Sequence, residues 1–487
     1  MSAAVAFLIG YFVVMLGIGL WAARRTGASD EEYLLGGRRL GPAVTALRLQ
    51  STSMSGYMFA GAGALGYTSG YYGMWYALGD LGGGLLNLSV LGKRMRTLSH
   101  KLGSISSIEY LGDRYDSQLV RRVGAVLAVG ALFLYLLGQF IAGGAGLASV
   151  TGLPFNTALL IAVGVIVAYT FLGGYLAVAY TDFAQALVMV VGMTWILIAT
   201  VRAVGGLSAG HASIAELNPN LLTMFGADLE YRGQWGTILG ALLIFSIGYM
   251  GWPHVVVSHM AMKNPAVTRK ASVYSVLFNL VFVPAPYLVG LFALLLVPNL
   301  ADPETAIFAV AQKVLPGCAV GVVMAAVMAA IMSTADALLL QASTIVARDL
   351  LPRGGAARWT VLVLATAGIA VALWQPPTVL SLITFAATVL GSAFAPSYIC
   401  AVWWPKANKA GALASMLTGA VVSVGWNALG LDAATGWDAM VAGIGSSTLA
   451  MVVGNAGDAA ALPSASSHSG STAGDLKKGG PKAALVS

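Results

Sequence analysis

Ala330, Ser333 and Thr334 place three oxygen-bearing groups on one face of an expected helix. They stand in the apolar stretch AAIMSTADALLL at positions i, i+3 and i+4, which share a helix face. Na⁺ is a hard cation and prefers oxygen ligands, as other hard cations do. The two hydroxyls and the Ala330 carbonyl would therefore offer Na⁺ three oxygens. The alternative is that both hydroxyls only bond to the preceding turn of their own helix.

A second polar stretch lies inside the apolar segment 41–66. Its middle reads QSTSMSG, residues 50–56. A continuous helix over 41–66 would reach about 39 Å, more than the ~30 Å of bilayer hydrocarbon. A break at this depth requires that the freed backbone groups face protein or a water-filled cavity. We therefore predict a broken helix whose free carbonyls, at Ser51 and Met54, complete the Na⁺ site. The alternative is a continuous helix with back-bonded hydroxyls.

A second break is expected in the segment FSIGYMGWPH, residues 245–254. Gly248, Gly251 and Pro253 together interrupt the ladder of helical hydrogen bonds. This break lies five spans after the first one. Two interrupted helices at matching positions of two five-span units are typical of transporters built from an inverted repeat.

The composition predicts an all-α polytopic membrane protein. Apolar residues make up 58% and charged residues 9% of the 487 residues, which no soluble domain of this size matches. Hydrophobic windows give roughly 13 transmembrane helices. Cys318 and Cys400 lie in apolar runs, so no disulfide framework is expected. His254 and His259 lack a third ligand at metal spacing, and there is no GxxxxGK[ST] loop.

The missing loop argues against a nucleotide-driven pump. An enzyme is not expected, because the chain has almost no soluble portion to house a nucleophile–base pair. The net charge of +7 is concentrated in loops, so it bears on topology and not on nucleic acid. We expect Na⁺ as the coupling ion, no organic cofactor, and a small-molecule solute and the lipid bilayer as partners. Most of the 26 Lys and Arg fall in loops after odd-numbered spans and in the C-terminal tail. The positive-inside rule then predicts a multi-pass cell-membrane protein (plasma or inner membrane), N-terminus outside and C-terminus cytoplasmic.

The expected organisation has one transmembrane domain and one tail. The domain covers 1–455, and the Ser/Gly/Pro/Lys-rich tail 456–487 is expected to be disordered. Within the domain we predict a first repeat over 41–203, an inverted repeat over 235–403, and flanking helices over 3–23, 408–430 and 436–455.

Three carboxylates, Asp80, Asp182 and Asp336, are expected at membrane depth, where ionisable groups are costly and functional by default. Asp182 follows Thr181 and could instead cap a helix. Asp80 either lines a cavity or is hydrogen-bonded inside the bundle. Most aromatic residues of membrane proteins serve packing or interface anchoring. Those near the two breaks, with one amide, are candidates for a solute pocket: Tyr57, Tyr135, Gln139, Phe245, Tyr249 and Trp252.

The chain resembles the sodium:solute symporter family, with a LeuT-like fold, from about residue 3 to 455. The resemblance is carried by EEYLLGGRRLGPAVTAL with STSMSG, YTFLGGYLAVAYTDFAQ, GYMGWPH, AAIMSTADALLLQAST and KANKAGALASMLTG. Among its members the chain is most similar to sodium/proline symporters, then to pantothenate and monocarboxylate symporters. It departs from the proline symporters at three positions. They carry Asp in place of Ser53, Trp in place of Phe245 and Gln in place of Trp252.

The resemblance implies a Na⁺-coupled symporter that imports a small organic solute, with proline first and pantothenate or a monocarboxylate as alternatives. Some members carry a fused signalling domain, so a solute sensor without transport is a rival; the tail is too short for such a domain. The implied Na⁺ ligands are Ser51, Met54, Ala330, Ser333 and Thr334. The implied solute positions are Tyr135, Phe245, Tyr249 and Pro253. A second cation site found in some members maps onto Asp182, Ser333 and Asp336, where the Asp336 carboxylate would strengthen the site or make it a proton site.

Overall fold

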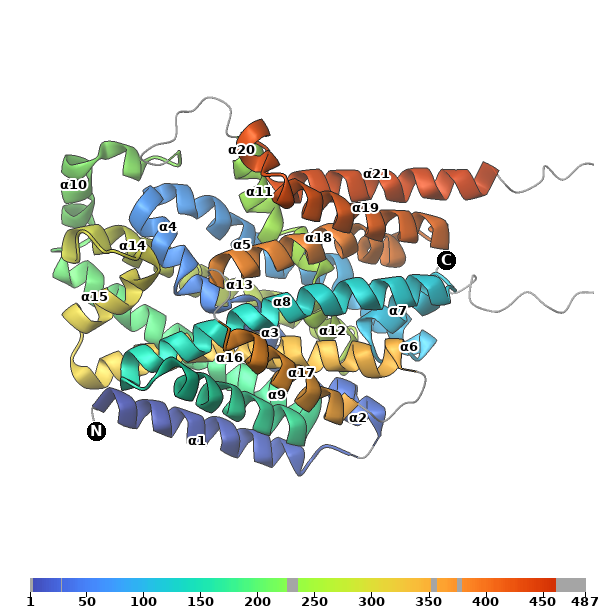
Figure 1. Cartoon of the computed structure of the whole chain (residues 1–487), viewed down its shortest axis with the longest axis horizontal. Coiled ribbons are helices and arrows are strands. Elements are labelled where there is room, and N and C mark those ends of the chain that lie inside the picture. The colour runs from blue at the N-terminus through green and yellow to red at the C-terminus, as the bar shows by residue number, and fades with distance from the viewer. Residues whose placement is uncertain (1–2, 28, 226–234, 352–356, 375–378, 461–487) are drawn as a thin grey trace, which may run out of the picture.

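The computed structural model describes residues 3–27, 29–225, 235–351, 357–374 and 379–460. Within these ranges the chain is helical, and its one β-type pairing is an isolated bridge between Leu40 and Met262. The helices lie mostly along the long axis of one bundle, and α1 begins at the end opposite to the one where α21 finishes (Figure 1). This arrangement agrees with an odd number of membrane crossings.

The helices of the first half are α1 (Ala3–Ala23), α2 (Asp30–Leu35), α3 (Pro42–Ser53), α4 (Gly61–Ser69), α5 (Met74–Asn87), α6 (Lys93–Leu102), α7 (Ser107–Arg114), α8 (Gln118–Thr151), α9 (Phe155–Ala203) and α10 (Leu207–Leu217). Those of the second half are α11 (Trp235–Phe245), α12 (Pro253–Met260), α13 (Val267–Phe282), α14 (Pro284–Leu296), α15 (Ala306–Val314), α16 (Gly317–Ile345), α17 (Ala357–Ala372), α18 (Val379–Trp403), α19 (Lys409–Ala428), α20 (Leu431–Thr435) and α21 (Ala439–Ala460). Short 3₁₀ turns lie between some of these helices, among them η2 (Gly56–Met58), η6 (Gly248–Gly251) and η7 (Pro303–Thr305).

Seven of the described helical segments are long and apolar enough to cross a membrane. The remaining predicted spans correspond to shorter helices and to the two interrupted segments. The longest helix, α9, has 49 residues, which at about 1.5 Å per residue is roughly 74 Å and enough for two crossings. The prediction of an all-helical, polytopic membrane protein is confirmed.

Gly174 divides α9 into its two crossings. Its backbone has φ 54° and ψ −143°, a conformation that a side chain would strain. A Cβ on Gly174 would also lie 2.4 Å from the Tyr33 carbonyl oxygen. The Tyr33 hydroxyl donates hydrogen bonds to the carbonyls of Thr170 and Phe171, both at 3.2 Å. One tyrosine of α2 thus satisfies carbonyls that the break sets free.

The first interrupted span is built from α3, η2 and α4, and the predicted break is confirmed. Helix α3 ends at Ser53, and Met54 has φ −82° and ψ 69°, which is not helical. Ser55 then caps η2, because its hydroxyl accepts a hydrogen bond from the Tyr57 amide at 3.2 Å. The hydroxyl-rich sequence therefore ends one half-helix and starts the next.

The second interrupted span is built from α11, η6 and α12. Trp252 is extended (φ −86°, ψ 111°), and Pro253 opens α12 at the helix position where a missing amide hydrogen does no harm. The two interrupted spans touch at the breaks, since the Tyr249 hydroxyl donates to the Leu49 carbonyl at 2.6 Å. At their other ends, Leu40 accepts from the Lys263 amide at 3.0 Å.

Helix α5 packs closely against α11 at the second break, and Gly83 makes this contact possible. A Cβ on Gly83 would lie 2.0 Å from the Phe245 carbonyl oxygen, so only glycine lets α5 approach α11 this closely.

Helices begin and end near the predicted repeat boundaries, at Pro42, Ala203, Trp235 and Trp403. The division into two repeats stays a prediction. Helix α21 runs to Ala460, and the rest of the predicted tail lies outside the described residues.

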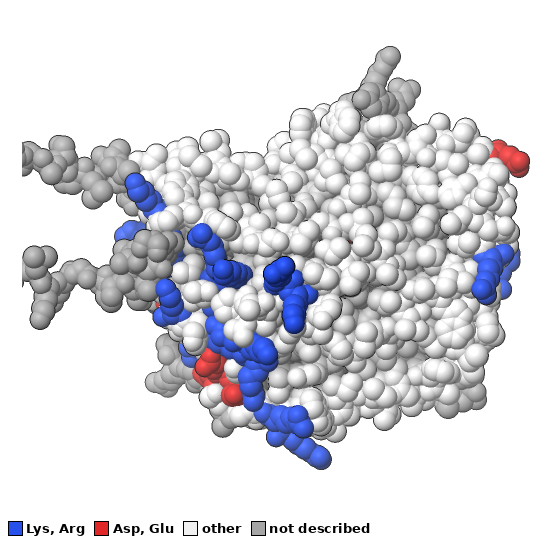
Figure 2. Space-filling view, turned by 180° about the vertical axis from the view of Figure 1, so that it is seen from behind, with Lys and Arg blue, Asp and Glu red and all other residues white. Residues whose placement is uncertain are grey.

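Basic side chains gather at one end of the bundle. Figure 2 shows most of the blue Lys and Arg surface there, and it is the end that carries α2, α6 and α7 (Figure 1). We call it the basic end. Helices α10 and α15 mark the opposite end (Figure 1).

Candidate ion and solute site

Two hydroxyls of α16 meet the broken end of α3. The Ser333 hydroxyl donates to the Ser51 carbonyl at 2.9 Å, and the Thr334 hydroxyl donates to the Thr52 carbonyl at 3.0 Å. Each hydroxyl also lies 3.2 Å from the Ala330 carbonyl oxygen of its own helix. Both sequence alternatives therefore hold at once, because the hydroxyls bond back to α16 and also reach across to α3.

This arrangement gathers five oxygens in a buried position. They are the carbonyls of Ser51, Thr52 and Ala330 and the hydroxyls of Ser333 and Thr334, and all five residues are buried. Oxygens about 3 Å apart can each approach a central hard cation to about 2.4 Å, because the hydroxyl hydrogens can rotate away. The donor set fits Na⁺, which as the transported ion would be cargo and not a resident cofactor.

Sequence reasoning missed Thr52 and included Met54. Thr52 lies in the last turn of α3. Carbonyls in the last turn of a helix have no amide of the same helix to accept from. Met54 is buried and directly follows the last residue of α3, Ser53, with a non-helical backbone. A role for the Met54 carbonyl stays a prediction.

Asp182 lies next to this oxygen cluster. The Thr52 hydroxyl donates to its Oδ2 at 3.3 Å, and Arg48 Nε lies 3.6 Å from the same oxygen. Asp182 sits in the interior of α9, so the helix-cap alternative is wrong. Among the described residues its Oδ1 has no hydrogen-bond partner.

The other two carboxylates are buried as well. Tyr169 donates its hydroxyl to Asp336 Oδ2 at 2.5 Å, whereas Asp336 Oδ1 finds no hydrogen bond within the described part of the chain. Asp80 accepts a hydrogen bond at its backbone carbonyl from Asn279 at 2.7 Å. The Ser333 hydroxyl contacts the Ser51 and Ala330 carbonyls of the five-oxygen cluster. The predicted second cation site of Asp182, Ser333 and Asp336 stays a prediction.

Arg48 is the functional candidate that sequence reasoning did not single out. Its side chain is 1% exposed, hydrogen-bonds to the Ser258 hydroxyl, and lies 4.3 Å above the Tyr175 ring centre. The available signal was an arginine alone inside an apolar span, which is rare and costly.

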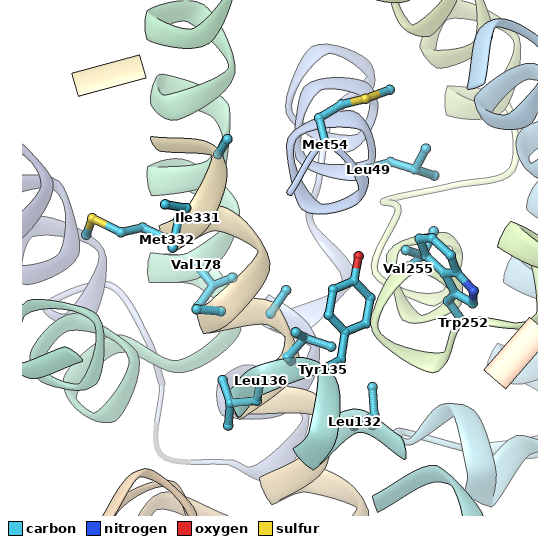
Figure 3. Packing of buried hydrophobic residues seen from close by; sticks show 14 of the residues in the cluster. Leu49, Met54, Leu132, Tyr135, Leu136, Val178, Trp252, Val255, Ile331 and Met332 are labelled. Carbon is cyan, nitrogen blue, oxygen red and sulfur yellow. The ribbon is translucent and has the colours of Figure 1, made fainter. Parts of the chain in front are cut away.

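The predicted aromatic pocket residues cluster around Trp252. Its ring centre lies 5.2 Å from Tyr249 and 6.0 Å from both Tyr135 and Phe245, and Tyr57 packs on Phe245 at 5.2 Å. Figure 3 shows the Tyr135 ring pointing from α8 into the space between Leu49 and Met54 on one side and Trp252 on the other. All of these rings are buried. The structure thus brings the aromatic candidates together at the two breaks.

Polar groups border the aromatic cluster. Gln139 accepts a hydrogen bond from the Gly56 amide at 3.2 Å, and its Nε2 donor is buried with no partner in the described residues. Pro253, the remaining candidate, is buried at the start of α12. The His254 ring stacks on Trp252, with the ring centres 5.7 Å apart. Neither His254 ring nitrogen has a hydrogen-bond partner among the residues that the structure describes.

A cavity of about 420 Å³ leads toward this centre from the end opposite to the basic end. Gly56 and Ile331 line it next to the oxygen cluster, and Asp302 and Glu304 line it at η7. Burial raises the pKa of the Glu304 carboxyl above its ordinary value, and the neighbouring Asp302 charge raises it further. The cavity therefore joins two carboxyl groups at one end of the bundle to the first break.

The family model described as "Sodium:solute symporter family" matches residues 33–419. Sodium/proline symporters of Staphylococcus aureus, for example those of strains JH9 and NCTC 8325, are 30% identical over 440 residues, covering 85% of this chain and 84% of theirs. A Na⁺-coupled sialic acid symporter, solved in a substrate-bound outward-open state, matches with a TM-score of 0.77 at 18% identity, covering 95% of this chain and 98% of its own. Mhp1, a nucleobase-cation-symport-1 family transporter, matches with a TM-score of 0.59 at 17% identity, covering 88% and 95%.

The structural matches confirm the LeuT-like fold that the family resemblance implied. The family model and the relatives cover most of the chain. The family and the relatives are named as sodium symporters, which agrees with Na⁺ as the coupling ion. The chain therefore belongs to the sodium:solute symporter family and is a multi-pass membrane transporter, not an enzyme.

Proposed function

We propose that the protein imports a small organic solute together with Na⁺, and that proline is the best candidate solute. The observation that carries the proposal is the contact of Ser333 and Thr334 with the open end of α3. A cation held there would tie α16 to the first interrupted span, so Na⁺ binding would favour one arrangement of these two helices. The solute would bind beside it, among the aromatic rings around Trp252.

Membrane orientation follows from charge. The basic end would face the cytoplasm, with the N-terminus outside and the C-terminus inside. The cavity at the opposite end would then open to the exterior. One Na⁺ that moves inward across 100 mV releases about 2.3 kcal/mol, before its concentration gradient is counted. Rocking of packed helices around the site would open it to each side in turn.

The solute is proposed from similarity and from the pocket. The 30% identical relatives are named sodium/proline symporters, which favours an amino acid with a carboxylate and an apolar ring. The buried Nε2 of Gln139 is a donor for such a carboxylate, and the rings of Tyr135 and Trp252 would pack on the apolar part. Pantothenate and short monocarboxylates also carry a carboxylate and are the alternative solutes.

The test is uptake into proteoliposomes with an imposed Na⁺ gradient. Radiolabelled proline, pantothenate, short monocarboxylates and sugars are compared, with a K⁺ gradient of equal size as control. We expect uphill accumulation of proline that requires external Na⁺ and collapses with a Na⁺ ionophore. Accumulation of pantothenate or a monocarboxylate alone would replace the solute and keep Na⁺ symport. Saturable solute binding without uptake would favour the rival, a non-transporting sensor, and equilibration without accumulation would indicate a channel.

A further inference from the structure

Three ionisable side chains from three helices lie near one another inside the bundle, because Asp182 interacts with both Arg48 and Asp336. Arg48 of α3 is 1% exposed, and Asp182 of α9 and Asp336 of α16 are fully buried. Buried charges at membrane depth are costly unless opposite charges accompany them. The balance between this one cation and the two carboxylates therefore constrains how many Na⁺ ions the centre takes up.

Arg48 is held in place from several sides. Asp182 Oδ2 lies 3.6 Å from its Nε, the Ser258 hydroxyl bonds to the guanidinium, and the Tyr175 ring lies 4.3 Å below it. Arginine keeps its positive charge in proteins. The chain thus carries a permanent cation beside the Asp182 carboxylate.

Thr52 connects this charge cluster to the five-oxygen site. Its hydroxyl donates to Asp182 at 3.3 Å, while its carbonyl accepts from Thr334 at 3.0 Å. Asp336 lies two residues beyond Thr334 on α16 and accepts a hydrogen bond from Tyr169. Both carboxylates are therefore close in the chain or in space to the oxygens that fit Na⁺.

We propose that the Arg48 guanidinium is the resident cation of the Asp182 and Asp336 pair, so that the centre binds one Na⁺ per chain and not two. Two carboxylates balance one guanidinium and one Na⁺. When both carboxyls are ionised and Na⁺ is absent, the cluster carries one uncompensated negative charge, which attracts the ion to the neighbouring oxygens. The guanidinium supplies from within the chain the positive charge that a second ion at Asp182, Ser333 and Asp336 would otherwise supply.

This inference rests on the proposed Na⁺ coupling and adds its stoichiometry. The direct test is equilibrium binding of ²²Na⁺ to the purified full-length chain in nanodiscs, which needs no solute. We expect one Na⁺ per chain with a Hill coefficient of one. Two Na⁺ per chain would overturn the role of Arg48 and leave Na⁺ coupling intact. No saturable Na⁺ binding would instead contradict the proposed Na⁺ symport itself.

Variants test the mechanism. Arg48→Gln removes the resident cation, and we expect bound Na⁺ to double to two per chain. Asp182→Asn added to Arg48→Gln should return the value to one, and Arg48→Lys, which keeps a cation, should stay at one. A folded Arg48→Gln protein that binds one Na⁺ with unchanged affinity would overturn the inference. If Arg48→Gln fails to fold, the wild-type stoichiometry decides alone, with one ion supporting the inference and two contradicting it.

Discussion

The Thr334 hydroxyl donates a hydrogen bond of 3.0 Å to the Thr52 carbonyl. These two residues lie on α16 and α3, 282 positions apart in the chain. The contact joins a continuous helix to the open end of a broken one. A cation bound by both oxygens would replace this hydrogen bond and hold the two helices together more strongly.

Thr334→Ala removes one oxygen from this site. We expect the Na⁺ concentration for half-maximal uptake to rise about tenfold or more, since a hydrogen-bonding group that faces a charge contributes about 1.5–3 kcal/mol. Na⁺-dependent uptake in proteoliposomes measures it. Thr344→Ala is the matched control, because within the described part of the chain the Thr344 hydroxyl bonds only to the Leu340 carbonyl of the same helix, at 2.8 Å. Equal Na⁺ dependence in both variants would remove Thr334 from the site.

Trp252→Phe tests the aromatic centre. The indole Nε1 donates to the Ala387 carbonyl at 3.1 Å, which ties the second break to α18. Loss of this bond costs about 1 kcal/mol, so we expect the solute KM to rise about fivefold with little change in Na⁺ dependence. Trp403→Phe is the control, since that exposed indole donates to the Val90 carbonyl at 2.8 Å. A similar KM shift in the control would place the effect outside the pocket.

The raised pKa of Glu304 predicts that Na⁺ entry depends on pH. Burial and Asp302 raise the pKa of Glu304 above its ordinary value, so this carboxyl gains a proton earlier than an exposed glutamate as the pH falls. The cavity then loses a negative charge, and the apparent Na⁺ affinity should fall about twofold toward acid pH, as suits a partly exposed charge. Uptake at several Na⁺ concentrations and pH values measures this.

Glu304→Gln should have the lower Na⁺ affinity already at neutral pH and show a flatter pH profile. Glu216→Gln is the control, because Glu216 is exposed on α10 at the same end and does not line the cavity. An unchanged profile in Glu304→Gln would show that Na⁺ does not pass this carboxyl.

Asp438 predicts a pH dependence of stability. Its Oδ1 accepts from the Met440 amide at 2.7 Å at the start of α21, but burial raises its pKa from 3.8 to about 6. A folded pKa above the unfolded one means that the folded state binds the proton more tightly. This contribution to stability is present below about pH 4 and is lost as the pH rises through 6.

Asp438→Asn keeps the cap and removes the charge. We expect its melting temperature to exceed that of the wild type at pH 7.5, and the difference to shrink toward pH 5. Asp302→Asn is the control, because Asp302 caps η7 through the Glu304 amide at 3.0 Å from an exposed position. A difference that is constant with pH would contradict the role of burial at Asp438.

The sequence alone determined the class of fold and the positions of its interruptions. Apolar runs of membrane length, the hydroxyl-rich segment 50–56 and Pro253 act locally, through hydrophobic burial and lost backbone hydrogen bonds. The spacing of Ser333 and Thr334 placed both hydroxyls on one helix face for the same local reason.

Only the tertiary structure decided what that face meets. Helical periodicity orients side chains about their own axis, but it does not select the partner helix or its register. The Thr52 carbonyl, the pairing of Arg48 with Asp182 and the bond from Tyr169 to Asp336 all join residues of different helices. Their choice depends on how the whole bundle packs around α16, because each contact forms only when distant segments have already been brought together.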